Sequence, residues 1–393
     1  MSKTPRRLTQ KGFTLIELMV ALAMGLLIVL ALTTMLINVS RNNNEMSKTN
    51  RVIENGRFAL QLLESDISHA GYWGGYVPEF DNLTVSSAPT DVPTGVPDPC
   101  LAYASWNAAH KTNLLGVSVQ GYEIPLTVPS PALSVCASIV TRPQAQTDVL
   151  VVRHAETCLP GVGNCAAVDN TDLHFQMNRC GTIATPTPPY VLTNDATALI
   201  LQKRNCTVAN PNEYRRFMSS LYYVRNYSFT VGDGIPTLVR SQFGPVSGVL
   251  QHKSADAMID GVEGFRVEYG IDNLSDSGAA INLTAAITWA SSTSPTNRGD
   301  GIPDGSYVRC TTDTPCTVAQ LMNAVAVKIY VLVRSENNTS GYTDSKVYCL
   351  SGSGCPVGET PSRTLGPFGD GYKRHLFAQT MRLNNVSARR ETP

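Results

Sequence analysis

Residues 11–17, Lys-Gly-Phe-Thr-Leu-Ile-Glu, and the uncharged run at 18–40 that follows them decide the organisation of this chain. A helix of about 20 apolar residues crosses a bilayer, so this run is long enough to do so. One carboxylate, that of Glu17, stands at the start of the run, and placing an ionised carboxylate in hydrocarbon costs roughly 3 kcal/mol or more. Glu17 therefore needs a partner of opposite charge. Cleavage between Gly12 and Phe13 would create one, an amine four residues away.

The charges before the run indicate its orientation. Segment 1–12 carries only basic charges, which by the positive-inside rule keep it in the cytoplasm; they are Lys3, Arg6, Arg7 and Lys11. A secretory signal is cut after its apolar region, at an Ala-x-Ala-like site, and the residues around Ser40 form no such site. Cleavage before the run would instead leave it on the mature protein as an anchor. A simple single-span membrane protein is the alternative, although it gives Glu17 no role.

This arrangement resembles the signal of type IV pilins and type II secretion pseudopilins: a glycine, the cleavage site, a phenylalanine, then Thr-Leu-Ile-Glu. The resemblance implies that residues 1–12 are a leader peptide, and that a prepilin peptidase cleaves after Gly12 and methylates the amine of Phe13. It also implies that Glu17 pairs with the Phe13 amine of a neighbouring subunit during assembly from the inner membrane. A buried charge kept for such pairing specifies register rather than maximising stability.

Overall charge and length limit the classes of partner and the number of domains that the chain can have. The chain has 393 residues, 31 of them basic and 31 acidic; loss of the four basic residues of the leader leaves 27 basic against 31 acidic, a net charge of −4. A nucleic-acid-binding protein would carry a basic excess, so we expect no nucleic-acid partner. The length allows two or three domains or one large β-rich head.

The helix is predicted to continue past the apolar run, because no proline occurs between Phe13 and Val77. Residues 13–40 are expected to form its membrane half and residues 41–71 an amphipathic half that ends at Gly71. Apolar residues recur along one face of this second half, at Met46, Ile53, Leu60, Leu63, Ile67 and Ala70. We expect that face to pack against the head, residues 72–393.

The head is predicted to be rich in β-strands. Short runs with many β-branched residues indicate strands at 147–153, 221–231, 265–271 and 324–334. The last of these alternates cleanly, with Lys328, Tyr330 and Arg334 opposite the β-branched face, which predicts one buried face. The fold class expected is α+β and type IV pilin-like: a long N-terminal helix packed on an antiparallel β-sheet head.

Turn and loop signals separate the predicted strands. Gly232-Asp233-Gly234 indicates a hairpin turn between 227–231 and 237–241. Residues 78–99 hold five prolines and are predicted to be an irregular surface loop, and a second loop is predicted around Pro186, Pro188 and Pro189.

Five segments of the chain resemble PilW-type minor pilins. They are residues 54–74, 147–153, 222–240, 258–272 and 324–335. The resemblance implies a minor pilin, and some of these segments are shared with J-type pseudopilins of type II secretion. A head of over 300 residues is large for the repeating subunit of a fibre. Size and resemblance together indicate an initiating or tip-proximal subunit.

The ten cysteines all lie downstream of the predicted helix, in the part expected to face the periplasm. They are Cys100, Cys136, Cys158, Cys165, Cys180, Cys206, Cys310, Cys316, Cys349 and Cys355. In an oxidising compartment they predict a disulfide framework whose connectivity the spacing leaves open. Short separations favour 158–165, 310–316 and 349–355, and 100–136 with 180–206 would complete a nearest-neighbour set. Metal binding is the alternative, but no Cys-x-x-Cys pair or cysteine–histidine cluster occurs.

Three weaker motifs have plain structural interpretations. Residues 299–304 resemble half of a calcium loop, but only Asp300 and Asp304 supply carboxylates, so a solvated turn is favoured. Arg298-Gly299-Asp300 spells an adhesion tripeptide, which three residues match easily by chance. The basic cluster at 373–375 is interpreted as an exposed strand edge whose charges discourage pairing, in preference to DNA binding.

No catalytic motif occurs, so we expect no enzyme, no cofactor and no metal site. Six histidines are scattered along the chain and are expected to be surface or satisfied side chains; they are His69, His110, His154, His174, His252 and His375.

We expect a single-pass inner-membrane protein with a cytoplasmic leader and a periplasmic head, which reaches the pilus and the cell surface after assembly. Its expected partners are the prepilin peptidase, the inner membrane, other minor and major pilins and a tip adhesin, with roles in adhesion and twitching motility. The alternatives are a J-type pseudopilin of a type II secretion system and, in another class, a membrane-anchored periplasmic binding or sensing domain.

Overall fold

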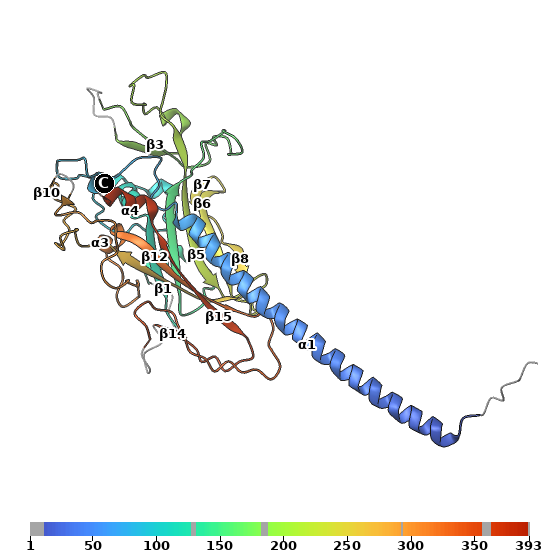
Figure 1. Cartoon of the computed structure of the whole chain (residues 1–393). Helices are drawn as coiled ribbons and strands as arrows, with labels where there is room; N and C mark the ends of the chain where they lie inside the picture. Colours follow the sequence, from blue (N-terminus) through green and yellow to red (C-terminus); the bar gives the residue numbers. More distant parts are fainter. Residues whose placement is uncertain (1–11, 127–130, 182–187, 292–293, 356–362, 392–393) are drawn as a thin grey trace, which may run out of the picture. The chain divides into compact units, whose positions relative to one another are not determined.

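A computed structural model describes residues 12–126, 131–181, 188–291, 294–355 and 363–391 of the chain. They divide into two compact units, one ending at Arg51 and the other beginning at Val52. We call the described residues of the first unit, 12–51, the stem, and those of the second the head. One uninterrupted helix, α1 (Leu15–Ile67), supplies most of the stem and the first residues of the head (Figure 1). The predicted long helix is therefore confirmed, although it ends at Ile67 and not at Gly71.

The head is built on antiparallel sheets. In the largest sheet, β1 (Val119–Ile124) pairs with β2 (Thr147–Ala155), β2 with β5 (Tyr214–Arg225), β5 with β3 (His174–Met177) and β3 with β4 (Tyr190–Thr193). On its other side, β5 pairs with β6 (Thr237–Val246), which also pairs with β7 (Val249–His252) and β8 (Asp256–Asp260). A second sheet has the order β15 (Arg374–Arg382), β12 (Ala324–Arg334), β9 (Val262–Ile271).

The remaining elements of the head are short. The helices are α2 (Ala108–Gly116), α3 (Val318–Met322) and α4 (Asn384–Arg390), and the 3-10 turns are η1 (Glu79–Asp81), η2 (Tyr103–Ser105), η3 (Pro131–Cys136) and η4 (Ala196–Ala198). Two small ladders pair β10 (Trp289–Ser291) with β11 (Ser294–Pro295) and β13 (Tyr348–Cys349) with β14 (Thr364–Leu365). The α+β fold class, with an antiparallel head, is confirmed.

The head segment of α1 packs into the main core through small and apolar residues. Its buried side chains are Val52, Gly56, Ala59, Leu60, Leu63 and Ile67. At Gly56 a Cβ would lie 2.1 Å from the ring of Phe377 on β15, so only glycine admits this contact. The predicted apolar face is right from Leu60 onward. It is wrong at Met46, which is 63% exposed because it lies in the stem, before the head begins.

The predicted strands at 147–153, 265–271 and 324–334 lie within β2, β9 and β12. The strand predicted at 221–231 ends early, at Arg225. Beyond that point the carboxylate of Asp233 accepts the backbone N–H groups of Ser228, Phe229, Thr230 and Ile235, which satisfies donors that a longer β5–β6 ladder would have used. The hairpin connection is therefore a longer loop than predicted.

The prediction of one buried face for β12 is wrong. Tyr330 is 4% exposed and Leu332 is fully buried, on the face expected to be polar. They form a second small core with Tyr348, Leu350 and Leu365, contributed by the chain around β13 and β14. Both faces of this central strand are covered, whereas the alternation in its sequence indicated only the first core.

The predicted loop at 78–99 lacks regular structure apart from η1, but it is not confined to the surface. Phe80 and Asp81 are buried, and so are Pro93 and Pro97. Of the second proline-rich loop, Pro188 and Pro189 are exposed, and Pro186 lies outside the described residues.

Candidate functional site

The start of α1 is built from the signal residues themselves. Gly12, Phe13 and Thr14 precede the helix, and Phe13 is 90% exposed. The backbone N and Oγ1 of Thr14 donate to Glu17 Oε2 at 2.9 and 2.8 Å, and the N–H of Glu17 donates to Thr14 Oγ1 at 3.4 Å. This reciprocal pair is a capping box, in which the Thr and the Glu three residues later satisfy donors that the first turn leaves open. The motif therefore also encodes the point at which the helix begins.

The stem presents an apolar surface. Every residue from 12 to 44 is exposed, and one window of 18 residues in α1 has a mean hydropathy of 2.7 with none of it buried. By length and composition this helix can cross a membrane. Two threonine hydroxyls in this segment are satisfied within the helix. Thr33 Oγ1 donates to the carbonyl of Val29 at 2.6 Å, and Thr34 Oγ1 donates to that of Ala31 at 2.8 Å. Lipid or other apolar helices are the surroundings that such a surface requires.

Where α1 ends inside the head, a buried polar cluster fixes it to the large sheet. Asp66 Oδ1 lies 2.8 Å from His154 Nε2, and Tyr222 OH donates to Asp66 Oδ2 at 2.9 Å. His154 Nδ1 lies 2.9 Å from the carbonyl of Ala155, so both ring nitrogens face acceptors, the pattern of a protonated imidazole. Asp66 belongs to α1, His154 to β2 and Tyr222 to β5. The cluster therefore joins three elements.

Electrostatics favour the charged pair despite its burial. Burial opposes ionisation of Asp66, but the hydrogen bonds and charge supplied by His154, with the Tyr222 hydroxyl, outweigh it and lower the pKa of the carboxyl. Burial likewise opposes the charged form of His154, and the hydrogen bond and charge of Asp66 overcome it and raise the pKa of the imidazole. His154 was expected to be an unremarkable surface or satisfied histidine; it is satisfied, and it anchors the helix.

This pair predicts a pH dependence of head stability. We compare the free energy of unfolding of the unchanged chain with that of His154→Gln, which is neutral at every pH. The folded pKa of Asp66 lies below its ordinary 3.8 and that of His154 above its ordinary 6.5. The unchanged chain should exceed His154→Gln in free energy of unfolding by most at about pH 5 to 6, where both partners are charged. This excess should shrink as pH rises through the raised pKa of His154, and also as pH falls through the lowered pKa of Asp66. Denaturant unfolding across this range measures it; a difference independent of pH would contradict the pairing.

Arginine clusters hold other parts of the head. Arg309 Nη2 lies 2.5 Å from Asp148 Oδ1 and 3.0 Å from Glu123 Oε1. Arg390, at the end of α4, contacts Asp81 at 2.8 Å and Asp272 at 3.2 Å, with its side chain 2% exposed. Sequence patterns did not reveal these pairs because the partners lie far apart in the chain.

The basic cluster at 373–375 lies on a strand edge, as predicted, but only His375 is exposed there. β15 is an edge strand, but the side chain of Arg374 is fully buried. Its guanidinium contacts Glu263 at 2.5 Å, Asp370 at 2.6 Å and Asp344 at 3.0 Å. Three carboxylates, brought together by the fold, draw this arginine into the interior, where the sequence alone showed only a local run of positive charge.

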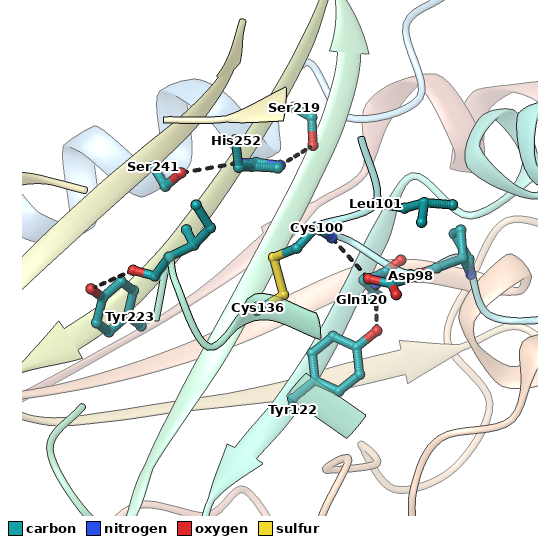
Figure 2. Close-up of a disulfide and its surroundings, with 12 residues drawn as sticks. Asp98, Cys100, Leu101, Gln120, Tyr122, Cys136, Ser219, Tyr223, Ser241 and His252 are labelled. Carbon is teal, nitrogen blue, oxygen red and sulfur yellow. Dashed lines mark hydrogen bonds between the residues drawn. A yellow bond between two sulfur atoms is a disulfide. The ribbon is translucent and has the colours of Figure 1, made fainter. Parts of the chain in front are cut away.

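Five disulfides brace the head, and they are the nearest-neighbour pairs. They join Cys100 to Cys136, Cys158 to Cys165, Cys180 to Cys206, Cys310 to Cys316 and Cys349 to Cys355. The Cys100–Cys136 bridge lies beside β1, where the N–H of Cys100 donates to Asp98 Oδ1 at 3.0 Å (Figure 2). Each bridge thus joins cysteines that are neighbours in the sequence order, 6 to 36 residues apart, and the longest of these loops encloses α2 and β1.

Loop length predicts how much each bridge stabilises the head. The Cys100–Cys136 pair spans 36 residues and the Cys310–Cys316 pair only 6. Chain entropy alone gives roughly 4 kcal/mol for the first loop and roughly 2 kcal/mol for the second. Replacing both cysteines of one bridge by serine should lower the free energy of unfolding in that order, measured by urea unfolding of the full chain in detergent. Equal losses for the two bridges would contradict the entropic account.

The turn at 299–304 is solvated only in part: Gly299 and Gly301 are buried, and Ile302 is 60% exposed. Asp300 Oδ1 accepts the N–H of Ile302 at 2.9 Å, and Asp304 Oδ2 accepts the N–H groups of Asn273 and Leu274 at 2.8 and 2.7 Å. Both carboxylates thus organise backbone. Arg298 is 2% exposed and donates to carbonyl groups, so the arginine of the Arg298-Gly299-Asp300 tripeptide is not presented to solvent.

One histidine lies between two serines, an arrangement that sequence spacing could not show. His252 Nε2 lies 3.3 Å from Ser219 Oγ and Nδ1 lies 3.0 Å from Ser241 Oγ (Figure 2). Burial lowers the pKa of His252 to about 3, so the ring is neutral at pH 7. At 2% exposure, with both nitrogens engaged, this histidine joins strands β5, β6 and β7 within the sheet.

Two family models match the chain. Residues 7–33 match the prokaryotic N-terminal methylation motif, and residues 221–385 match the type IV pilus-assembly protein W family. Comparison with curated proteins and with solved structures gave no match. The second match begins within β5 and reaches into α4, so it includes the whole β15–β12–β9 sheet. The resemblance to PilW-type minor pilins is confirmed, and the two matches support a type IV pilus-related pilin: the chain has a prepilin-type signal at one end and a pilus-assembly protein W region in its head.

Proposed function

We propose that the chain is a minor pilin that initiates or caps the type IV pilus, together with other minor pilins and a tip adhesin. The observation that carries this is the presence, on one chain, of a prepilin-type signal and a PilW-family head. A prepilin peptidase would cut after Gly12 and methylate Phe13, leaving residues 13–40 as the membrane anchor. The leader would face the cytoplasm and the head the periplasm until assembly carries the head to the cell surface.

The stem and the head supply the two requirements of such a subunit. The stem offers an exposed apolar helix with one carboxylate, Glu17, in its first turn, which suits lateral packing among similar helices with one charged pairing. The head is large and braced by five disulfides, which suits exposure outside the cell. A head of this size would crowd a closely repeating array, which favours the end of a filament.

Deletion tests the role and separates it from the pseudopilin alternative. Cells lacking the chain should lose at least nine-tenths of their surface pili, counted by electron microscopy, and should regain them on complementation. Their type II secretion of extracellular enzymes should be unchanged. Normal pili with impaired secretion would assign the chain to a secretion pseudopilus instead. Gold-labelled antibody against the head should then mark filament ends; labelling along the shaft would overturn the tip position.

A further inference from the structure

Strand β1 is the edge of the large sheet and pairs only with β2 in the described part of the chain. The ladder shows which backbone groups face that partner. Ser118 O accepts from Arg153 N at 2.8 Å and Ile124 O from Gln146 N at 2.9 Å, so these residues and the alternate ones between them face β2. Gly121 and Glu123 lie between residues that face β2. Backbone groups alternate in direction along a strand, so the N–H and C=O groups of these two residues point away from the sheet.

The outward edge of β1 borders a pocket of about 460 Å³. Gly121, Tyr122 and Glu123 line one side, and the disulfide loop at 310–316 lines the other, with Val96 and Leu321 among the apolar contacts. Gly121 is buried, yet among the described residues no group bonds to the outward N–H or C=O of Gly121 or Glu123. Buried backbone polar groups are rarely left open, because each costs free energy until a partner arrives.

The pocket is held open by fixed contacts. The N–H of Thr312 donates to Glu123 Oε2 at 3.0 Å, and Arg309 Nη2 donates to Glu123 Oε1 at 3.0 Å, so the 310–316 loop is fixed against β1. The Cys310–Cys316 bridge closes that loop. A preformed site of this kind spares a ligand the entropy of ordering it.

Two carboxylates line the pocket, those of Asp98 and Glu123, and the second is paired with Arg309. Asp98 lies beside Gln120 and Tyr122 (Figure 2), and its Oδ1 accepts the N–H of Cys100. Asp98 makes no salt bridge among the described residues, although the buried guanidinium of Arg153 attracts its carboxylate from beyond salt-bridge distance. A cationic side chain therefore fits next to it, and an apolar one fits the wall formed by Val96, Leu321 and the disulfide.

We propose that this site binds an extended peptide segment of a partner chain as an added strand. The segment would hydrogen-bond to the outward backbone of Gly121 and Glu123, place one apolar side chain in the pocket, and set a lysine or arginine beside Asp98. Adding a strand to a sheet edge draws affinity from main-chain bonds and specificity from pockets for alternate side chains. The proposal does not depend on where the chain lies in a filament.

The test uses the full chain in detergent and an eight-residue peptide of alternating valine and lysine. In one control peptide the backbone amides of the valines are N-methylated, and in the other those of the lysines are. In an added strand, the amides of only one of these two residue types point toward β1. At least one control should bind tenfold more weakly or worse. Amide hydrogen exchange should slow at Gly121 and Glu123 and stay unchanged at Gln120 and Tyr122, which already face β2. Equal affinity of all three peptides, or no binding of any, would overturn the proposal.

A matched pair of protein variants tests the charge. Asp98→Asn keeps the oxygen that accepts the Cys100 N–H and removes only the charge. Asp195 makes the same contact to the residue two positions on, the N–H of Thr197, and Asp195→Asn is the control. Asp98→Asn should weaken the valine–lysine peptide at least threefold, and Asp195→Asn should not. Equal effects of the two variants would overturn the assignment of the cation to Asp98.

Discussion

Glu17→Gln should abolish incorporation of the chain into pili while leaving its membrane insertion and its cleavage intact. Glutamine can replace glutamate in a capping box, so the start of α1, where Thr14 and Glu17 bond to each other, survives the change. The negative charge does not. If pairing with the Phe13 amine of a neighbour sets register, loss of that charge should lower the amount of the chain in sheared pili at least tenfold.

The control for this prediction is Thr14→Ser, which retains both the hydroxyl and the charge and should be incorporated normally. Immunoblots of the membrane fraction and of sheared pili measure insertion and incorporation separately. Glu17→Gln at the level of the unchanged chain in pili would show that the carboxylate serves only to begin the helix.

Arg374→Met should be among the most destabilising single changes in the head, at about 3 to 5 kcal/mol. The guanidinium is fully buried among Glu263, Asp344 and Asp370, and its removal leaves three carboxylates close together, with Asp344 fully buried. Methionine fills part of the volume but pairs with none of them. The expected loss is large because the stranded charges, rather than the missing attraction, dominate the cost.

Arg382→Met is the matched control, since Arg382 lies on the same strand with its side chain 50% exposed and bonds to Ser387 and Glu391. An exposed pair contributes little, so this change should cost about 1 kcal/mol or less. Urea unfolding of both variants, with the disulfides intact, measures the difference. A loss for Arg374→Met no larger than that for Arg382→Met would contradict the role assigned to the buried cluster.

The parts of the fold that rest on local patterns could be predicted from the sequence. The apolar run and the absence of proline indicate α1, and regular alternation indicates β12, because each pattern is a property of neighbouring residues. The contacts that join elements could not be predicted in this way. Asp66 lies 88 residues from His154 and 156 from Tyr222, and nothing local distinguishes it from the other acidic residues of the helix.

Two of the errors share a physical cause, since polar residues were expected at the surface and the fold brings them inside. Arg374 is buried because three carboxylates surround it, and Tyr330 because the chain around β13 and β14 covers a face that looked solvated. β5 ends early because one side chain, Asp233, satisfies the backbone donors beyond it. The outward edge of β1 was missed because strand order cannot be obtained from one strand's sequence.

The N-terminus of the mature protein tests the central claim most directly. Pili sheared from cells, digested and analysed by mass spectrometry, should yield a peptide from this chain that begins at Phe13 and carries one added methyl group on its amine. That result would join the signal at residues 7–33 to processing and to presence in the filament. A chain that keeps residues 1–12, or that begins after the apolar run near Ser40, would contradict the account.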